Sequence, residues 1–330
     1  MKLEQLGEFG LIDLIRKKFS ARSKNIFIGI GDDAAVIKTR PGTVSVLTTD
    51  ALVESVHFDL NYFSFYQLGG RSLAASLSDL AAMGATPVCA LVTLGINENV
   101  SVEDVLQFYS GFSHLAKRFN CPLAGGDISL SPERMVISVT VLGQVKKGKV
   151  FFRSGARPGD LICVSGTLGQ SQAGLELLQR RMKHSRFSFP KNLAAKHLMP
   201  LPRLDVSLLL SKNVKVNSAI DISDGLTADL KHICDESKVG ALIFADLIPV
   251  SSKAVRAAKL LKKSPLDFAL YGGEEYELLF TLDPKDARKL FRKTGRKFSV
   301  IGQIESRKNG IWIASGNKKE KLSPRGYTHF

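Results

Sequence analysis

Several kinds of sequence feature are scarce in this chain, and each absence argues against a class of protein. The 330 residues include four cysteines, Cys89, Cys121, Cys163 and Cys234, with no CxxC pair and no Cys/His cluster. This spacing argues against a zinc site and against a disulfide framework. No apolar run is long enough to span a membrane, and neither a fixed-period repeat nor a low-complexity segment is found.

The composition that remains is that of an ordinary globular protein. Hydrophobic residues make up 44% of the chain and charged residues 23%, and the length allows one large or two ordinary domains. The first 19 residues place Glu4, Glu8 and Asp13 among apolar positions. This pattern predicts an amphipathic helix rather than a signal peptide, so we expect a cytoplasmic location.

Acidic residues are outnumbered by basic ones. The chain has 46 Lys and Arg against 31 Asp and Glu, a formal net charge of +15, and much of the excess lies late in the sequence. A basic chain favours anionic partners such as phosphates, nucleotides or nucleic acid. Lysines at helical spacing are more often a solvated face, and no RNA-recognition or zinc-finger motif is found. We therefore expect small anions rather than nucleic acid.

The hydrophobic pattern alternates between strands and helices in both halves of the chain. Strands are predicted over residues 34–39, 43–50, 87–96, 134–145, 161–166, 218–223, 241–245, 276–282, 298–304 and 310–314, and helices over 1–19, 65–83, 102–119, 171–182 and 225–237. Pro41-Gly42 indicates a hairpin between the first two strands. A basic, Gly/Pro-rich stretch at 146–160 predicts a domain junction, so we expect two α+β domains, 1–150 and 151–330, with a cleft between them.

Two stretches can be compared with phosphate-binding loops. Gly143–Lys149 nearly matches GxxxxGK[ST], but Val150 replaces the hydroxyl residue and a strand-like run follows. The glycine-rich stretch before the 171–182 helix is a better candidate, because a helix N-terminus offers free N–H groups to an anion. Tight packing of this helix against its strand explains the same glycines.

What the chain does have is a set of aspartates at the edges of apolar segments, beside Gly, Ser or Thr. They are Asp32, Asp33, Asp50, Asp79, Asp127, Asp221 and Asp224. Taken singly, each can be a helix cap or a turn residue. Together they would repel one another without a cation, and oxygen ligands favour magnesium, manganese or calcium over zinc. Thr48, Thr49 and Ser223 can add oxygen ligands, and Arg153 can bind phosphate or form a salt bridge at the junction.

A last acidic stretch, YGGEEYELLF, contains Glu274, Glu275 and Glu277. In an alternating strand, neighbouring glutamates would lie on different faces, so not all three can serve one site. A glutamate at the end of a loop can accept hydrogen bonds from an amino-heterocycle. An ordinary exposed glutamate fits the spacing equally well.

These motifs together resemble the thiamine-monophosphate kinases, a family of the PurM-like (aminoimidazole-ribonucleotide-synthetase-related) superfamily. The matching stretches are GIGDDAAVI, LTTDALVESVHF, LSDLAAMGATP, AGGDIS, RSGARPGD, AIDISDGL, GGEEYEL and GYTHF, in the family's order and nearly end to end. The resemblance implies an α+β PurM-like fold of two domains. It also implies a homodimer whose N-terminal domains pair their sheets, and the ATP-dependent phosphorylation of thiamine monophosphate to thiamine diphosphate.

The resemblance also implies roles for individual residues. Several magnesium ions would be held by Asp33, Thr48, Thr49, Asp50, Asp79, Asp127, Asp221 and Asp224. ATP would contact Gly126, Asp127, Arg153 and Ser223, and the thiamine phosphate would contact His57 and Glu274. In the family, an aromatic residue is common where this chain has Pro324-Arg325. We therefore take Tyr327 as the residue that would form the aromatic wall of the substrate pocket. Glu275 stands where the family usually has aspartate, and Asp32 would hold the loop.

The implied reaction needs no general base and no covalent nucleophile. A phosphate oxygen of the substrate would be the nucleophile, and it is already ionised near pH 7 because the second pKa of a phosphate is about 6. We therefore expect direct in-line transfer assisted by metal ions. The alternatives are another ATP-using PurM-like enzyme, either an amidine-forming ligase or a selenophosphate-synthetase-like enzyme, a nucleic-acid-binding protein, or an inactive scaffold.

Overall fold

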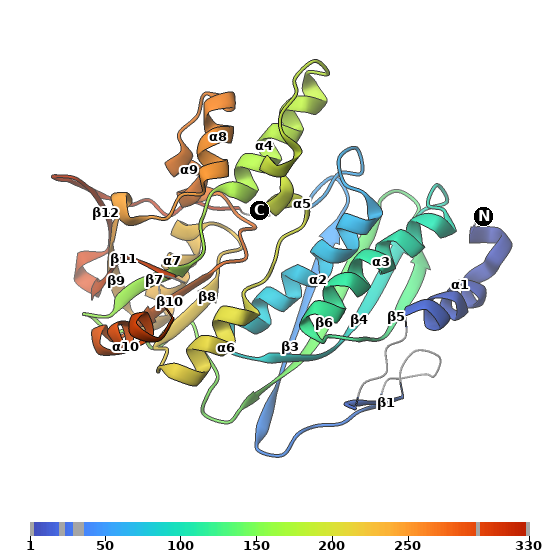
Figure 1. The fold of residues 1–330 in the computed structure, drawn as a ribbon, viewed down its shortest axis with the longest axis horizontal. Helices are drawn as coiled ribbons and strands as arrows, with labels where there is room; N and C mark the ends of the chain where they lie inside the picture. Colours follow the sequence, from blue (N-terminus) through green and yellow to red (C-terminus); the bar gives the residue numbers. More distant parts are fainter. Residues whose placement is uncertain (1–2, 20–23, 29–35, 295–297, 328–330) are drawn as a thin grey trace. The chain divides into compact units, whose positions relative to one another are not determined.

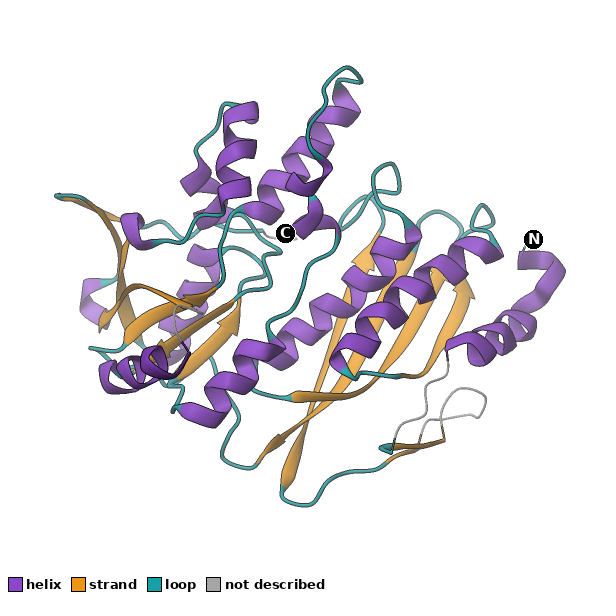
Figure 2. Cartoon of the chain, viewed as in Figure 1, coloured by secondary structure: helices purple, strands orange, loops and turns teal. Residues whose placement is uncertain are grey.

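The chain divides into two compact units. The computed structural model describes residues 3–19, 24–28, 36–294 and 298–327. One unit takes residues 1–80 and 85–148, and the other takes residues 81–84 and 149–330. Each unit combines sheets with helices (Figures 1 and 2), so the fold class is α+β. No helix among the described residues has the length and apolar character to cross a membrane.

The first unit is built on a four-stranded sheet in the order β3-β6-β4-β5. Its strands are β3 (Thr43–Val53), β4 (Thr86–Ile96), β5 (Leu123–Leu130) and β6 (Val136–Lys146). β6 pairs antiparallel with both β3 and β4, whereas β4 and β5 run parallel. The chain passes from β4 to its parallel neighbour β5 through α3 (Val102–Phe119), a right-sized crossover for such a pair.

Two long helices cover one face of this sheet, α2 (Phe65–Ala82) and α3 (Figure 1). A third helix, α1 (Leu3–Phe19), contacts α3. Side chains on a strand alternate between faces, and along β3 exposed residues alternate with part-buried or buried ones. The opposite face of the sheet carries exposed Leu47 and Leu91, so within this unit the sheet is buried on one side.

One expectation about this unit is wrong. The turn at Pro41-Gly42 forms, but it does not join a hairpin. Strand β2 (Val36–Ile37) pairs with β1 (Ile26–Ile28), while β3 pairs along its whole length with β6. A turn motif in the sequence predicts a change of chain direction. It does not predict which strands pair, because strand pairing depends on contacts between residues far apart in the sequence.

The second unit is built on a seven-stranded sheet in the order β13-β12-β9-β11-β7-β10-β8. The strands are β7 (Leu161–Ser165), β8 (Ser218–Asp221), β9 (Val239–Phe244), β10 (Leu278–Leu282), β11 (Phe298–Ser306), β12 (Ile311–Ser315) and β13 (Lys318–Lys321). β12 and β9 run parallel, and every other pair is antiparallel.

Helices of the second unit bury both faces of its central strands. They are α4 (Gln170–Lys183), α5 (Ala195–Leu198), α6 (Leu204–Asn213), α7 (Leu226–Ser237), α8 (Ser252–Leu261), α9 (Pro265–Tyr271) and α10 (Pro284–Thr294), with single 3-10 turns at Lys191–Leu193, Ala245–Leu247 and Arg307–Asn309. On β10, Leu279 packs in the core that holds α7, whereas Leu278 and Phe280 pack in the core that holds α6 and α10. This explains why the strands of this unit are apolar at successive positions.

Candidate functional site

In the first unit, two aspartates lie where β3 meets α2. Thr48 and Asp50 are two residues apart on β3 and therefore point to the same face, which is the helix-covered one. Ser76 and Asp79 are three residues apart on α2 and share one side of that helix. Ser76 Oγ donates a hydrogen bond to Asp50 Oδ2 (2.8 Å), and Thr48 Oγ1 donates to Asp79 Oδ2.

The environment of Asp50 disfavours its charge. Burial raises the pKa of this carboxyl, while the hydrogen bond from Ser76 and the nearby His57 act in the opposite direction. Within the described part of the chain, no lysine or arginine forms an ion pair with Asp50. A carboxylate that is held by the Ser76 hydroxyl and has no lysine or arginine partner has the surroundings that a bound metal ion would complete.

His57 is fixed by the backbone of the strand end. The backbone N–H of Val53 donates to Nδ1 of His57 (3.0 Å), and the backbone N–H of His57 donates to the carbonyl of Val53 (2.9 Å). Because Nδ1 accepts a hydrogen bond, the neutral ring carries its proton on Nε2. The ring therefore presents an N–H donor, which suits contact with an anion better than proton abstraction.

Two further predicted residues belong to the other face of the same sheet. Thr49 Oγ1 accepts a hydrogen bond from Thr140 Oγ1 (3.0 Å) and lies 3.3 Å from Ser138 Oγ. Asp127 is exposed, and its register partner is Thr93, itself exposed. The structure thus brings Thr48, Asp50 and Asp79 together but puts the side chains of Thr49 and Asp127 on the opposite face.

Gly126 precedes Asp127 at a position where the strands approach closely. A Cβ at Gly126 would lie 1.9 Å from the carbonyl oxygen of Val92, so no other residue fits this backbone. Gly126 itself is exposed. Asp33, the remaining predicted metal ligand of this half, and its neighbour Asp32 lie outside the described residues.

In the second unit, Asp221 and Asp224 flank the turn that leads from β8 into α7. The helix begins after Gly225, which has no side chain to cap it. The cap comes from within the helix, because the Asp229 carboxylate accepts from the backbone N–H groups of Asp224 (3.3 Å) and Gly225 (3.1 Å). Asp229 therefore fixes the backbone that carries Asp224.

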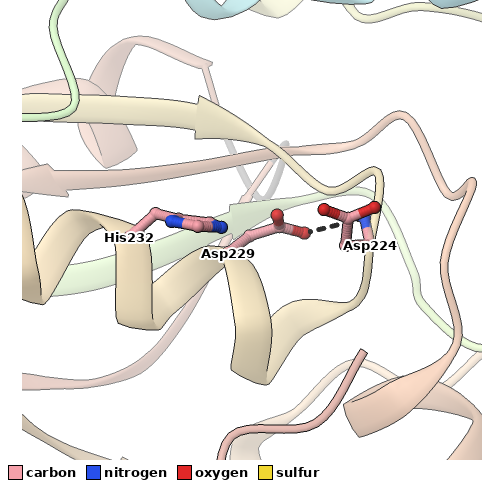
Figure 3. Close-up of side chains that lie close together, drawn as sticks. All are labelled: Asp224, Asp229 and His232. Carbon is pink, nitrogen blue, oxygen red and sulfur yellow. Dashed lines mark hydrogen bonds between the residues drawn. The ribbon is translucent and has the colours of Figure 1, made fainter. Parts of the chain in front are cut away.

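Three acidic side chains concentrate negative charge at this helix start. Burial raises the pKa of Asp229 to about 8, and the neighbouring charges of Asp221 and Asp224 contribute. Asp224, Asp229 and His232 each place a ligand atom within 4.8 Å of the others (Figure 3). The donor set of two carboxylates and one imidazole fits a divalent cation, which would relieve the repulsion.

Asp229 and His232 are not among the residues that sequence reasoning selected. The available signal is their spacing, because Asp229 and His232 are three residues apart on α7 and so share one side of the helix. Asp229 also lies in the first turn of that helix, where a carboxylate is favoured by the helix dipole.

Three separate segments meet at the turn that holds Ser223 and Asp224. The backbone N–H of Glu274 donates to the carbonyl of Ser223 (2.7 Å), and that of Tyr327 donates to the carbonyl of Asp224 (3.1 Å). A Cβ at Gly273 would lie 2.5 Å from the Ser223 carbonyl oxygen, so glycine is required for this approach. The Tyr327 side chain remains 47% exposed. Ser223, Asp224, Glu274 and Tyr327 are thus neighbours.

Arg153 lies near the start of the second unit with an exposed side chain. Its backbone carbonyl accepts a hydrogen bond from Ser237 Oγ (3.2 Å), at the end of α7. Within the described residues, the hydrogen bonds and ion pairs do not connect its guanidinium to the turn at Ser223.

The glutamates of residues 274–277 do not lie in a strand, because β10 begins at Leu278. Glu275 and Glu277 are both buried, and Lys196 lies between them, with Nζ 2.8 Å from Glu275 Oε2 and 2.9 Å from Glu277 Oε1. Arg203 Nη1 contacts Glu277 Oε2 at 2.7 Å. This pair of carboxylates is neutralised by the chain's own cations.

One of these glutamates also binds the N-terminal turn of α4, which follows the glycine-rich loop. The backbone N–H of Ser171, in the first turn of α4, donates to Glu275 Oε1 (2.9 Å). The free N–H group that the sequence offered to an anion therefore binds an internal carboxylate. The other loop, Gly143–Lys149, ends β6 and is followed by no helix.

Comparison with known proteins places the chain in a family. It matches the family described as AIR synthase related protein over residues 31–145 for the N-terminal domain and 157–314 for the C-terminal domain. A thiamine-monophosphate kinase of Aquifex aeolicus (strain VF5) is 37% identical over 330 residues, which is all of both chains. One of Bacillus subtilis (strain 168) is 32% identical, with 98% of this chain and 100% of the relative covered.

The chain belongs to the thiamine-monophosphate kinase family.

A solved structure described as AaThiL complexed with AMPPCP and TMP is similar in three dimensions as well. It has a TM-score of 0.77 and 36% identity, and the match covers 100% of this chain and 99% of the other. The PurM-like two-domain fold implied by the sequence is thereby confirmed for this member of the thiamine-monophosphate kinase family.

Arg325, just before the Gly326-Tyr327 pair, has a visible structural role. Its guanidinium lies over the ring of Tyr271, 6.0 Å from the centroid. The backbone N–H of Arg325 also donates to Thr227 Oγ1 (3.1 Å), in the first turn of α7. The segment that carries Tyr327 is therefore attached to the same helix start as Asp224.

Proposed function

We propose that this chain transfers the γ-phosphoryl group of ATP to thiamine monophosphate and forms thiamine diphosphate. The proposal is supported by relatives named thiamine-monophosphate kinase that match over the full length. It is also supported by the similar structure described as complexed with AMPPCP and TMP. The observation in this chain that carries the proposal is the environment of Asp50 and Asp229: each lies close to a second aspartate that is a proposed metal ligand, and among the described residues neither forms an ion pair with lysine or arginine.

We assign the proposed roles as follows. Mg²⁺ ions are held by Asp33, Thr48, Thr49, Asp50, Asp79, Asp127, Asp221 and Asp224, ATP is contacted by Gly126, Asp127, Arg153 and Ser223, and thiamine monophosphate is contacted by His57, Glu274 and Tyr327. Thr49 and Asp127 share one face of the first sheet, so they would act on a different part of the substrates from Asp50 and Asp79.

The proposed transfer is direct and in line, without a phosphoenzyme. The main obstacle is repulsion between two polyanions, since one pair of unit charges at ~4 Å costs about 4 kcal/mol at an effective dielectric of 20. Bound Mg²⁺ would neutralise this charge on the phosphates. The chain's carboxylates hold the ions, and the exposed Arg153 adds a positive charge of its own.

No general base is required by this reaction. The attacking phosphate oxygen is ionised near pH 7, because the second pKa of a phosphate is about 6. His57, with its proton on Nε2, is suited to donate a hydrogen bond to the substrate phosphate. Because the proposed transfer is direct, no residue of the chain has to carry the phosphoryl group.

We further propose a homodimer formed through the open face of the four-stranded sheet. Leu47 on β3 is 70% exposed, and Leu91 on the central strand β4 is 40% exposed on the same face. Apolar side chains at these alternating strand positions would be buried against a second copy. Sedimentation should give a dimer for the wild type, and Leu47→Glu should shift it toward the monomer.

Product analysis tests the main proposal. The chain is incubated with ATP, Mg²⁺ and thiamine monophosphate, and thiamine diphosphate and ADP are quantified by chromatography. Equal amounts of the two products are expected, and none without Mg²⁺. ATP hydrolysis without thiamine diphosphate would contradict the proposal and favour another PurM-like enzyme, such as an amidine-forming ligase or a selenophosphate-synthetase-like enzyme. A phosphorylated protein that persists after ATP treatment would contradict direct transfer.

A further inference from the structure

The segment Gly272–Glu277 is held in an unusual backbone conformation. Glu274 has φ 58° and Tyr276 has φ 51°, both in the left-handed region that non-glycine residues rarely occupy. Such a conformation persists only where surrounding contacts determine it. Backbone bonds supply part of this, since Glu274 N–H binds the Ser223 carbonyl (2.7 Å) and Tyr276 N–H binds the Ile222 carbonyl (2.9 Å).

Side-chain contacts from the short helix α5 supply the rest. Lys196 lies between the buried carboxylates of Glu275 and Glu277, at 2.8 Å and 2.9 Å. The next residue, His197, has Nδ1 3.4 Å from Glu274 Oε2. Two consecutive residues of one helix turn therefore contact all three glutamates of the segment.

The contact between His197 and Glu274 differs in character from the ion pairs of Lys196. The His197 side chain is 2% exposed, whereas that of Glu274 is 28% exposed. Nδ1 of His197 also lies 3.4 Å from Ser171 Oγ, in the first turn of α4. Glu274 is thus contacted from the buried side and remains accessible from the solvent side, next to the turn that carries Ser223 and Asp224.

We propose that Lys196 and His197 are positioning residues that hold Glu274 ready for the substrate. This inference rests on the proposed function, in which Glu274 contacts thiamine monophosphate. A glutamate free to change rotamer would lose that freedom on binding, and a glutamate already fixed does not. Lys196 holds the backbone of the segment by binding the carboxylates of Glu275 and Glu277. His197 contacts the Glu274 carboxylate directly.

Kinetics of His197 variants test the proposal. In His197→Phe we expect the KM for thiamine monophosphate to rise roughly 5- to 10-fold, the size of one lost hydrogen bond. The KM for ATP and kcat should stay within about twofold of the wild type, because neither depends on the Glu274 carboxylate in this scheme. His197→Asn keeps a donor near the Nδ1 position and should recover most of the loss. His184→Phe, at the exposed end of α4, is the matched control and should change nothing.

Amide hydrogen exchange gives a readout that does not depend on turnover. The amides of Glu274 and Tyr276 should exchange faster in His197→Phe and in Lys196→Arg than in the wild type, and exchange in β10 should be unchanged. A wild type that makes no thiamine diphosphate would defeat the proposed function, and the exchange result would still decide the positioning role. An active wild type, with an unchanged KM for thiamine monophosphate in His197→Phe or with both KM values raised equally, would overturn the inference.

Discussion

Two groups of buried or partly buried carboxylates in this molecule are stabilised in opposite ways. Glu275 and Glu277 lie around Lys196, with Arg203 as a second cation on Glu277. Asp50 in the first unit has Ser76 as its hydrogen-bond donor, and Asp229 in the second has the backbone N–H groups of a helix start. Among the described residues, neither aspartate has an ion pair with lysine or arginine.

The difference separates acids whose charge the chain compensates itself from acids that we propose to lie at a ligand site. A buried charge needs a compensating charge, and the chain supplies it for the glutamates. For the aspartates it supplies dipoles. Burial raises the pKa of Asp50 and Asp229 and also that of Glu275, so the lack of a lysine or arginine ion pair, rather than the pKa, separates the two groups. A carboxylate in that situation is a candidate for function.

The largest expected effect is on the glutamates that the chain neutralises itself. Lys196→Met leaves two buried carboxylates without their shared cation and should lower the free energy of unfolding by about 3–5 kcal/mol. Lys196→Arg should keep most of the stability, because the positive charge remains. Urea denaturation measures both variants, and a loss below about 1 kcal/mol in Lys196→Met would remove the contrast between the two groups.

The second prediction concerns the aspartates. Asp50→Asn and Asp224→Asn should each lower kcat/KM at least about 100-fold, since each removes a proposed metal ligand. Glu133→Gln, at an exposed position of the first unit, is the matched control. Full activity in either aspartate variant would show that the residue holds no essential ion.

In contrast to its activity, the free energy of unfolding of Asp50→Asn should be unchanged or higher. Burial raises the pKa of Asp50 above 3.8, so its ionised form destabilises the folded state as the pH rises above about 4. In a chelating buffer at neutral pH, the variant should therefore be as stable as the wild type or more so. The difference should disappear below pH 4, where Asp50 is protonated in both the folded and the unfolded chain. Thermal unfolding across this pH range provides the measurement.

Metal binding gives a smaller effect. Mg²⁺ at about ten times its Kd should stabilise the wild type by about 1.4 kcal/mol, measured by thermal unfolding in the presence of AMPPCP. Asp79→Asn should reduce the stabilisation, whereas Lys196→Arg should retain it. Equal stabilisation of the wild type and Asp79→Asn would separate this aspartate from the metal site.

The smallest effect is expected at the cysteines, which are buried yet need no partner because a thiol stays neutral. Burial raises the pKa of Cys89 to about 11 and that of Cys234 to about 12, and it also raises those of Cys121 and Cys163. At pH 8 almost none of these groups is a thiolate, and all four are buried. Iodoacetamide should modify the folded chain far more slowly than the urea-unfolded chain, as mass spectrometry would show.

Most of the elements of the fold could be predicted from hydrophobic periodicity. The amphipathic pattern at 102–119 coincides with α3, and the strand predicted at 161–166 coincides with β7 within one residue. Strand pairing was less accessible, as the wrong hairpin at Pro41-Gly42 shows. The partner of β3 is β6, more than 80 residues away, and no local signal carries that information.

For the candidate site, the sequence could name candidate residues but not their geometry. The aspartates stood out because each follows an apolar segment, and the pairing of Asp50 with α2 follows from the alternation along β3. The strand predicted at 276–282 begins two residues later, at Leu278, after Tyr276 in the left-handed region, so all three glutamates precede it. Nothing in the sequence around Lys196 and His197 indicates a role for them, because their contacts with the glutamates are visible only in the structure.

The alternation of side chains along strand β3 restricts which changes of length this strand can accept. Thr48 and Asp50 belong to one face and Thr49 to the other, so any codon added or lost inside Thr43–Val53 would exchange the two faces from that point on. The turn at Pro41-Gly42 is under no such restriction. Across natural variants, changes of length should therefore accumulate in that turn, while the strand itself should vary by substitution alone.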